Sequence, residues 1–281
     1  LHDALPISDK SLEKCMDNLK SNLNSMNIWF QENKLTLNAD KSSFMIYHSF
    51  RKNVSNDLYS IDIGNMKIRR STSVKYLGMI IDETLTWKQH VQNVCDSSVK
   101  YTGIFRHVKH FITRQLIRPI YFSFVYSRIK YGIEIYGSCS SNLTKRIQVM
   151  QNKLLKILCQ YNYRYNTSLL HSELNLLKVK DIHKMHILCF VYDCLNNNII
   201  DIFSNYFQTR SQQNYRITRN THQLVTVQTR TELARTTVQY IGTRLWNDFN
   251  FRNINFISKS VFKQFIKNQY LISYQELFDE N

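Results

Sequence analysis

The sequence has 281 residues, of which 43% are hydrophobic, and this apolar content is enough for the cores of about two domains, so a wholly disordered chain is excluded. Its 37 Lys and Arg outnumber its 21 Asp and Glu, and the formal charge of +16 favours a polyanion, nucleic acid before an anionic membrane surface. Neither an apolar run of about 18 residues nor a signal-peptide pattern is present. We therefore expect an intracellular protein, nuclear or cytoplasmic, with no membrane partner.

The first predicted element is a helix over residues 9–34, because its apolar residues recur in steps of three and four and form one stripe. The stripe consists of Leu12, Met16, Leu19, Leu23, Met26 and Phe30. Two short strands are expected next, over residues 35–37 and 44–47, on either side of a polar turn at 38–41.

A hairpin is predicted after these strands. Residues 59–63 alternate between apolar and polar, Gly64 and Asn65 tolerate the positive φ of a tight turn, and residues 66–69 return. One further strand is predicted over residues 74–81, which are mostly apolar.

Beyond Trp87 the apolar spacing becomes helical. We expect one long helix that ends near His110, and a second that runs from an N-cap at Thr113 toward Tyr131. Pro119 lies inside the second helix and must either begin a new segment or kink the helix, because proline has no backbone N–H.

The remaining elements are also mostly helical. Helices are predicted over residues 143–157 and 179–192, and a short terminal helix after Ser258, which can cap it. Residues 208–237 are rich in Thr, Arg and Gln and poor in large apolar residues, which indicates a linker or an exposed basic hairpin. This order of elements predicts an α+β domain followed by a helical one, with a boundary near residue 88 or 110.

The cysteines form no Cys-x-x-Cys pair, so we expect reduced and mostly buried thiols. They are Cys15, Cys95, Cys139, Cys159, Cys189 and Cys194. His183, His186 and Cys189 could present three metal ligands from one helix. Apolar residues alternate with these three, however, and no fourth ligand is near, which favours ordinary core positions.

Two runs of residues carry a resemblance to a known family. Residues 29–47, WFQENKLTLNADKSSFMIY, resemble a helix-to-strand passage with the pattern N-K-L-x-L-N-x-x-K-[ST]. Residues 74–90, VKYLGMIIDETLTWKQH, resemble a segment with the pattern Y-L-G-V-x-x-D…L-x-W-x-x-H, which is a hairpin that grips the primer strand. Both patterns are typical of reverse transcriptases from jockey-like, LINE-type non-LTR retrotransposons, where they occur at the same spacing.

Later segments are similar to the same family. Residues 131–137, 143–158 and 240–247 resemble its downstream motifs, although Phe249 and Asn250 replace the Leu-Pro that is expected after the last one. The resemblance covers roughly residues 9–270, which is nearly the whole chain.

The resemblance implies an α+β fold: part of a reverse-transcriptase palm, with a helix, short antiparallel strands and a hairpin, followed by a mostly α-helical thumb and C-terminal region. Residues 9–87 would be the C-terminal part of the palm, 88–200 a helical thumb-like domain, and 201–281 a basic linker and tail. The implied activity is that of an RNA-directed DNA polymerase, a nucleotidyltransferase that uses Mg²⁺, with an RNA template and a DNA primer as partners.

The beginning of the chain departs from the family. An aromatic-Ala-Asp-Asp motif, whose aspartates hold the metal ions of the polymerase, is expected at or just before Leu1. Residues 1–8 do not resemble the strand that carries this motif, and we expect an assembly artefact or a truncated strand there. The sequence therefore predicts a fragment that lacks the N-terminal part of the polymerase, binds no metal and is inactive alone. Asp82 and Glu83, an adjacent acidic pair, are expected to be solvated turn residues.

The resemblance also implies roles for four residues in template and primer binding. Lys41 would neutralise or protonate the pyrophosphate leaving group, and its alternative is a solvated turn lysine. Tyr76, Leu77 and Gly78 would form a primer grip, in which glycine allows a nucleic-acid strand to approach the backbone and tyrosine offers a stacking face. Their alternative is an ordinary strand with Gly78 easing a bulge.

Two basic sets are candidates for phosphate contacts. The first has Tyr101 and Phe105 interleaved between its cations and is typical of a thumb helix that follows a phosphate backbone without reading bases. It consists of Lys100, Arg106, Lys109, Arg114 and Arg118. The second could hold template RNA or target DNA, or could belong to a linker, and consists of Arg210, Arg216, Arg219, Arg230 and Arg235.

The leading hypothesis is a reverse-transcriptase fragment that positions template and primer without the catalytic Asp pair. An alternative is a non-catalytic remnant of a mobile element that binds RNA or an RNA/DNA hybrid. A third is a decayed copy that does not fold alone, because half a palm leaves a sheet edge unpaired.

Overall fold

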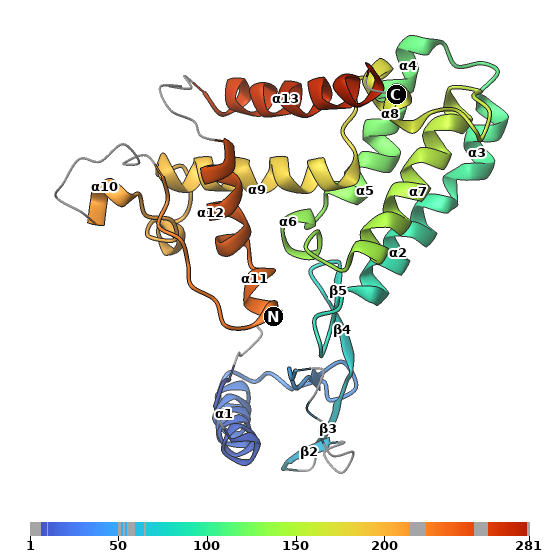
Figure 1. The fold of residues 1–281 in the computed structure, drawn as a ribbon. Helices are drawn as coiled ribbons and strands as arrows, with labels where there is room; N and C mark the ends of the chain where they lie inside the picture. Colours follow the sequence, from blue (N-terminus) through green and yellow to red (C-terminus); the bar gives the residue numbers. More distant parts are fainter. Residues whose placement is uncertain are drawn as a thin grey trace. The chain divides into compact units, whose positions relative to one another are not determined.

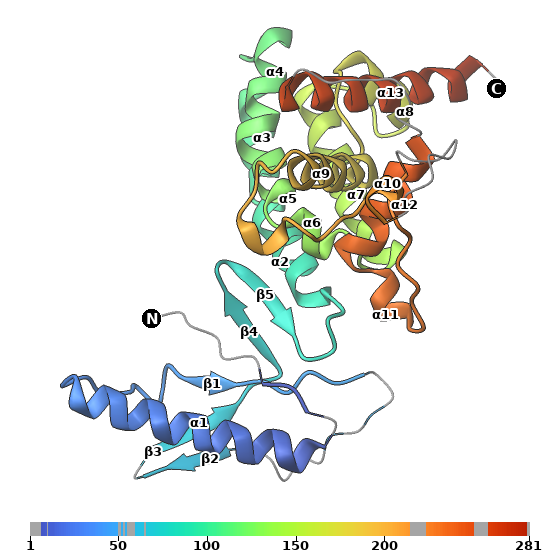
Figure 2. The same ribbon diagram turned by 90° about the vertical axis from the view of Figure 1, so that its left-hand side faces the viewer.

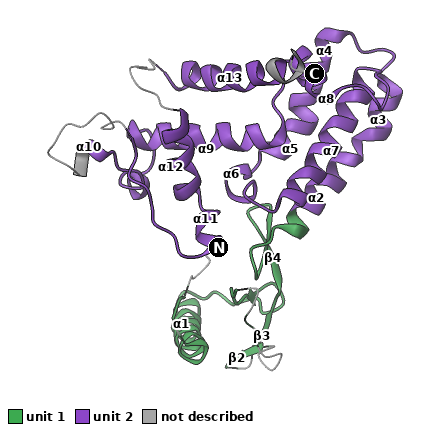
Figure 3. Cartoon of the chain, viewed as in Figure 1, with its two compact units in different colours: residues 1–90 green, residues 91–281 purple. Residues whose placement is uncertain are grey.

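The computed structural model describes residues 7–9, 11–49, 52, 54, 60–64, 66–213, 223–249 and 258–279 (Figure 1). The chain divides into two compact units, Leu1–His90 and Val91–Asn281 (Figure 3). The structure is mixed α+β, mostly helical with a few short strands, as the sequence predicts. Residues 1–6, which make up most of the expected artefact, lie outside the described residues.

In the first unit a helix covers one small sheet (Figure 2). Helix α1, Leu12–Glu32, confirms the predicted helix, and Met16 of its stripe is buried against Phe44 and Ile61. The sheet has the order β1-β3-β2 and consists of β1 (Ser43–Phe44), β2 (Ser60–Ile63) and β3 (Met66–Arg70). Leu12, Leu19 and Leu23 pack against the same core, so burial of one apolar stripe holds helix and sheet together.

The predicted hairpin is confirmed as β2 and β3, which pair antiparallel with Ile63 opposite Met66. Gly64 in its turn has a φ of 55°, a left-handed value that glycine adopts without a steric penalty. The strand predicted over residues 35–37 is wrong, and of residues 44–47 only Phe44 belongs to a strand. Apolar residues there pack on the core without ladder pairing, since Leu37 and Ile46 both contact it.

The single strand predicted over residues 74–81 is wrong, because the chain turns back in the middle of it. β4 (Ser73–Tyr76) and β5 (Met79–Asp82) form a second hairpin with Tyr76 opposite Met79. The two residues between them, Leu77 and Gly78, have φ values of 45° and 84°. Positive φ at both central residues is the mark of a tight two-residue hairpin turn, and leucine is an unusual residue for it.

The second unit is helical, and α2 (Lys88–Val99) leads into it. The predicted helix ending near His110 is confirmed as α2 and α3, which meet at Lys100. The other helices up to residue 195 are α3 (Tyr101–Val108), α4 (Arg114–Tyr121), α5 (Ser127–Lys130), α6 (Ile133–Tyr136), α7 (Ser141–Leu158), α8 (Thr167–Glu173) and α9 (Val179–Leu195). α9 is buried on most of its circumference, because α6, α7, α12 (Val238–Phe249) and α13 (Lys259–Asp279) all pack on it.

Pro119 does not begin a new segment. It lies inside α4, and the chain continues through a π-helical turn, η1 (Phe122–Tyr126), into α5. A proline removes one intrahelical hydrogen bond and crowds the preceding turn, and a π-turn that widens the helix shortly afterwards is one way to absorb this change.

The C-terminal region is more structured than predicted. The expected short terminal helix is the 21-residue α13, and Ser258 Oγ accepts a hydrogen bond from the Val261 amide at 3.4 Å, as its predicted capping role requires. η2 (Asp201–Phe203), α10 (Arg210–Gln213) and α11 (Glu232–Arg235) are short. Within segment 208–237, Thr209 and Leu224 form an antiparallel β-bridge, and Leu224 is fully buried. The residues around this bridge are therefore neither a free linker nor a fully exposed hairpin.

Candidate nucleic-acid interface

Lys41 is presented by a turn that its own motif builds. The Asn38 side-chain oxygen accepts a hydrogen bond from the Lys41 amide at 3.1 Å, and the Ser42 hydroxyl donates to the Asn38 carbonyl at 2.8 Å. The Lys41 residue itself is exposed. Asn38 and Ser42 of the N-x-x-K-[ST] pattern therefore stabilise the turn, and the side chain of Lys41 remains available to bind an anion.

The segment before this turn, N-K-L, is a helix end. The Lys34 amide donates to the Gln31 carbonyl and the Leu35 amide to the Phe30 carbonyl, at 3.0 and 2.8 Å. These two bonds form a Schellman motif, in which the left-handed position is Lys34 with a φ of 55°.

Tyr76, Leu77 and Gly78 form the tip of the β4–β5 hairpin. Leu77 is 62% exposed and Gly78 is also exposed, while Tyr76 is half-buried. The alternative of a bulge at Gly78 is wrong, because the residue lies in the turn itself. The tip thus presents backbone, one glycine and one apolar side chain to the solvent.

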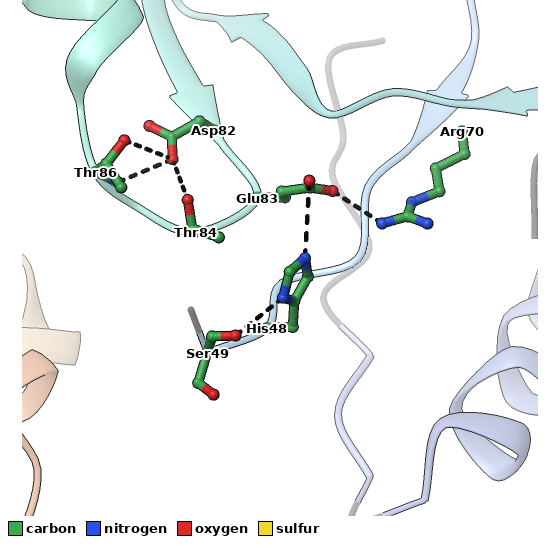
Figure 4. A network of polar contacts seen from close by, with 7 residues as sticks. All are labelled: His48, Ser49, Arg70, Asp82, Glu83, Thr84 and Thr86. Atoms are coloured by element: carbon green, nitrogen blue, oxygen red, sulfur yellow. Dashed lines mark hydrogen bonds and ion pairs between the residues drawn. The ribbon is translucent and has the colours of Figure 1, made fainter. Parts of the chain in front are cut away.

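Asp82 is not the solvated turn acid that the sequence suggests. It is 8% exposed, and its carboxylate accepts four hydrogen bonds. Three come from the Thr84 hydroxyl and from the Thr86 amide and hydroxyl (Figure 4), and the fourth comes from the Trp87 amide. Burial alone would raise the pKa of Asp82, but these hydrogen bonds outweigh burial and hold the pKa below its usual value. The aspartate therefore fastens the loop that leads from β5 into α2.

Glu83 points away from Asp82 and joins a different set of contacts (Figure 4). Its carboxylate pairs with the Arg70 guanidinium at 2.9 Å and lies 3.7 Å from His48 Nε2. Neither Asp82 nor Glu83 fits a Mg²⁺ site, because donors or cations already occupy their oxygens. Among the described residues no group of three or more His, Cys, Asp or Glu side chains could hold a metal ion.

The rest of the L-x-W-x-x-H pattern joins the hairpin to the helix. Trp87 is buried with a φ of 64°, and its ring meets the His90 imidazole edge-on at 6.4 Å. His90 Nδ1 accepts a hydrogen bond from the Ile80 amide at 3.3 Å. Burial lowers the pKa of His90, so the imidazole remains neutral and can accept this bond.

The first basic set lies on the α3–α4 region of the second unit. Lys100, Arg106 and Arg118 are exposed, and Arg114 is exposed with one contact to Glu173 at 3.3 Å. Lys109 is half-buried at the end of α3. The structure therefore leaves most of these cations available to phosphates.

The aromatic residues of this stretch differ from expectation. Phe105 is 1% exposed and belongs to the core, so it offers no stacking face. Tyr101 stacks on Phe105, and the Arg128 guanidinium lies over the Tyr101 ring at 5.3 Å and donates to its hydroxyl at 2.8 Å. Arg128 of α5 therefore extends the basic surface, and the sequence reasoning missed it because it is distant in the chain.

Helix α13 contributes further cations that the sequence reasoning missed. Burial, together with the positive charges of Arg118 and Lys263, lowers the pKa of Lys267. Lys263 and Lys267 are one helical turn apart, and this i, i+4 spacing was the available signal.

The second basic set is only partly described. Arg216 and Arg219 lie outside the described residues. Arg230 is exposed, Arg210 is half-buried, and Arg235 pairs with Glu232 at 3.4 Å within α11. These three are not brought together by any contact among the described side chains.

His183, His186 and Cys189 occupy core positions of α9 rather than a ligand set. His186 Nδ1 donates a hydrogen bond to the Glu134 carboxylate at 2.9 Å, and Nε2 is hydrogen-bonded to the Tyr126 hydroxyl at 3.1 Å. Burial lowers the pKa of His183 to about 4. The His183 imidazole fits against Gly137, the residue after α6, because a Cβ at this position would overlap the ring.

Comparisons with known proteins agree with the motifs. No family model matches the chain, and no solved structure matches it. The chain is 24% identical over 186 residues to the "Probable RNA-directed DNA polymerase from transposon BS" of Drosophila melanogaster, a match that covers 65% of this chain and 20% of that protein. It is 24% identical over 163 residues to the probable RNA-directed DNA polymerase from transposon X-element of the same fly, covering 56% of this chain and 17% of the relative.

A third relative is the RNA-directed DNA polymerase from mobile element jockey of Drosophila melanogaster, 21% identical over 183 residues, with 63% of this chain and 19% of the relative covered. The matches span about a fifth of the length of these curated relatives. Over about 60% of its length, this chain is a homologue of the RNA-directed DNA polymerases of Drosophila non-LTR retrotransposons.

Proposed function

We propose that this chain is the segment of a non-LTR retrotransposon reverse transcriptase that positions an RNA template and a DNA primer, while the metal-binding carboxylates come from outside the given sequence. The observation that carries the proposal is the set of exposed cations in the α3–α4 region in a chain of formal charge +16: Lys100 just before α3, Arg106 in α3 and Arg118 in α4. Such a surface attracts phosphates through counterion release and does not require base reading.

In this proposal residues 9–87 are the C-terminal part of the palm, 88–200 the thumb-like domain, and 201–281 a basic linker and tail. The β4–β5 tip, Tyr76 to Gly78, grips the primer strand, because its exposed glycine lets a sugar-phosphate backbone approach closely. Lys41 stabilises the negative charge that develops on the pyrophosphate leaving group. Mg²⁺, when held by the carboxylates of the intact polymerase, activates the attacking hydroxyl and neutralises the phosphate charge.

The experiment is a salt titration of binding to a labelled RNA/DNA hybrid with the purified full chain. The logarithm of the binding constant is expected to fall linearly with the logarithm of salt concentration, with a slope of roughly 0.9 per phosphate contact. The triple variant Lys100→Gln, Arg106→Gln, Arg118→Gln should bind more weakly and show a smaller slope. Lys20→Gln is the control, because Lys20 is an exposed cation of α1 that belongs to neither basic set.

Primer extension on the same hybrid with Mg²⁺ tests the catalytic part of the proposal. No nucleotide incorporation is expected from the chain alone. Incorporation would overturn the assignment of the metal carboxylates to another segment, and an absence of salt-dependent binding would overturn the positioning role.

A further inference from the structure

Two loops at one end of the helical unit each present a strongly exposed aromatic side chain. Phe111, between α3 and α4, is 86% exposed, and Tyr163, between α7 and α8, is 74% exposed. A large aromatic ring left in water costs free energy, because its apolar surface is not buried. Two such rings on neighbouring loops therefore mark a binding surface.

The contacts between the two loops are defined. Gln160 Nε2 donates to the Lys109 carbonyl at 2.9 Å, and the Arg114 guanidinium lies 3.3 Å from the Glu173 carboxylate. These bonds join residues more than fifty positions apart in the sequence. Figure 1 shows both loops at the end of the unit where α3, α4 and α8 meet.

The α7–α8 loop is held rigidly around Tyr163. Tyr161 and Tyr165 stack with ring centroids 4.1 Å apart, and both hydroxyls donate to the Glu173 carboxylate, Tyr161 at 2.8 Å. That carboxylate raises the pKa of both phenols. The backbone of Tyr163 is fixed as well, since Lys156 Nζ donates to its carbonyl at 2.6 Å. The Tyr163 side chain projects from this arrangement into solvent, and its hydroxyl accepts a hydrogen bond from Arg164 Nε at 2.7 Å.

The charge around these rings is positive. Arg164 lies over the Tyr163 ring at 5.4 Å, Arg114 and Lys109 flank Phe111 in the sequence, and Lys156 supports the loop. Glu173 is the acid among these contacts, and two phenols and one guanidinium already share its charge. An acidic peptide would use the cations but would leave the aromatic faces unused, whereas an unpaired nucleotide uses both.

We propose that the surface formed by Phe111, Tyr163, Lys109, Arg114 and Arg164 binds an unpaired stretch of nucleic acid, with bases stacked on the two rings and phosphates held by the cations. This proposal rests on the proposed function and adds a second kind of ligand to it, a single strand in place of a duplex. A base-paired hybrid buries its base faces, so it cannot use the rings and needs only the cations of α3 and α4.

The test compares fluorescence anisotropy of three labelled probes with the full chain: a single-stranded RNA, a single-stranded DNA of the same sequence, and an RNA/DNA hybrid. The double variant Phe111→Ala, Tyr163→Ala is expected to bind the single strands roughly tenfold or more weakly, because each stacked base contributes to affinity. Its hybrid affinity should stay within about twofold of the wild type, because phosphate contacts dominate there.

Two controls accompany the double variant. Tyr163→Phe keeps the ring and should retain single-strand binding, and Ile202→Ala removes another apolar side chain, 79% exposed, that should have no effect. All substituted side chains are exposed, so thermal unfolding should be unchanged within about one or two degrees.

Each outcome decides the matter. If the double variant loses affinity for both single strands, the result supports stacking of bases on the two rings. If it loses affinity for the single-stranded RNA only, the result supports the same surface with additional contacts to the 2′-hydroxyl. Unchanged single-strand affinity in the double variant, with hybrid binding intact, overturns the inference and leaves the proposed function standing. If the wild type binds none of the three probes at low salt, both this inference and the proposed function are overturned.

Discussion

Asn247 of α12 satisfies both backbone groups of Leu224 with one side chain. Its carboxamide oxygen accepts a hydrogen bond from the Leu224 amide at 2.8 Å, and its carboxamide nitrogen donates to the Leu224 carbonyl at 3.1 Å. Leu224 is fully buried in a cluster with Val191 and Phe207. The side chain thus replaces a neighbouring strand for this residue, and it fastens the segment 223–225 to the helical core.

Asn247→Ala should lower the free energy of unfolding by about 2–6 kcal/mol, because two buried backbone groups lose their partners at about 1–3 kcal/mol each. Chemical denaturation followed by circular dichroism measures the change. Asp248→Ala, an exposed neighbour on the same helix, should change stability by less than about 0.5 kcal/mol. Equal stabilities of Asn247→Ala and the wild type would contradict the anchoring role.

Gly137 and Gly103 give opposite predictions for the same substitution. A Cβ on Gly137 would overlap the His183 ring and the Ile133 carbonyl oxygen, so Gly137→Ala should destabilise by roughly 3 kcal/mol. A Cβ on Gly103, in α3, meets nothing within 4 Å, so Gly103→Ala should stabilise by up to about 1 kcal/mol through helix propensity. Thermal unfolding of the two variants should therefore shift the Tm in opposite directions.

Helix ends in this chain use residues other than glycine in the left-handed position. Lys34 has a φ of 55°, and Lys34→Gly should stabilise by up to about 1 kcal/mol, because glycine has no Cβ to strain there. The matched control is Lys20→Gly, at an exposed position inside the same helix, which should destabilise by about 1 kcal/mol. The same sign for both variants would show that strain at Lys34 is negligible.

Two buried histidines should make the helical unit less stable in mild acid. Burial lowers the pKa of both His171 and His183 to about 4, below the ordinary value of 6.5. The unfolded chain therefore binds more protons between these values, so stability is complete above pH 6.5 and falls as the pH drops toward 4. The expected slope is at most about 1.4 kcal/mol per pH unit for each histidine.

Denaturation midpoints measured from pH 7 to pH 4.5 check this expectation. His171→Asn should reduce the slope whatever it does to stability at pH 7, whereas His110→Gln, at an exposed position, should leave the slope unchanged. A flat profile for the wild type would mean that both histidines are protonated in the folded state. Asp82 and Glu134, whose pKa values lie below the usual carboxyl range, begin to lose their contributions only below about pH 5, so the slope between pH 7 and pH 5 is the one to compare.

Periodicity in the sequence determined the elements whose burial is one-sided and local. The apolar stripe from Leu12 to Phe30 predicted a helix that packs on a small core, and Gly64 predicted the turn of a hairpin. Both predictions were possible because residues close in the sequence supply the signal. The motifs of residues 29–47 and 74–90 were enough to identify the family of the relatives.

Tertiary structure alone decided the rest, because the deciding partners are distant or unusual. Leu77 is a poor turn residue, so the residue pattern predicted one continuous strand, and only the family resemblance indicated the hairpin that β4 and β5 form. Asp82 became a buried anchor only because the loop brings Thr84, Thr86 and Trp87 around it. Local periodicity predicts which residues are buried. Their packing partners are determined by contacts between segments far apart in the chain, which periodicity does not indicate.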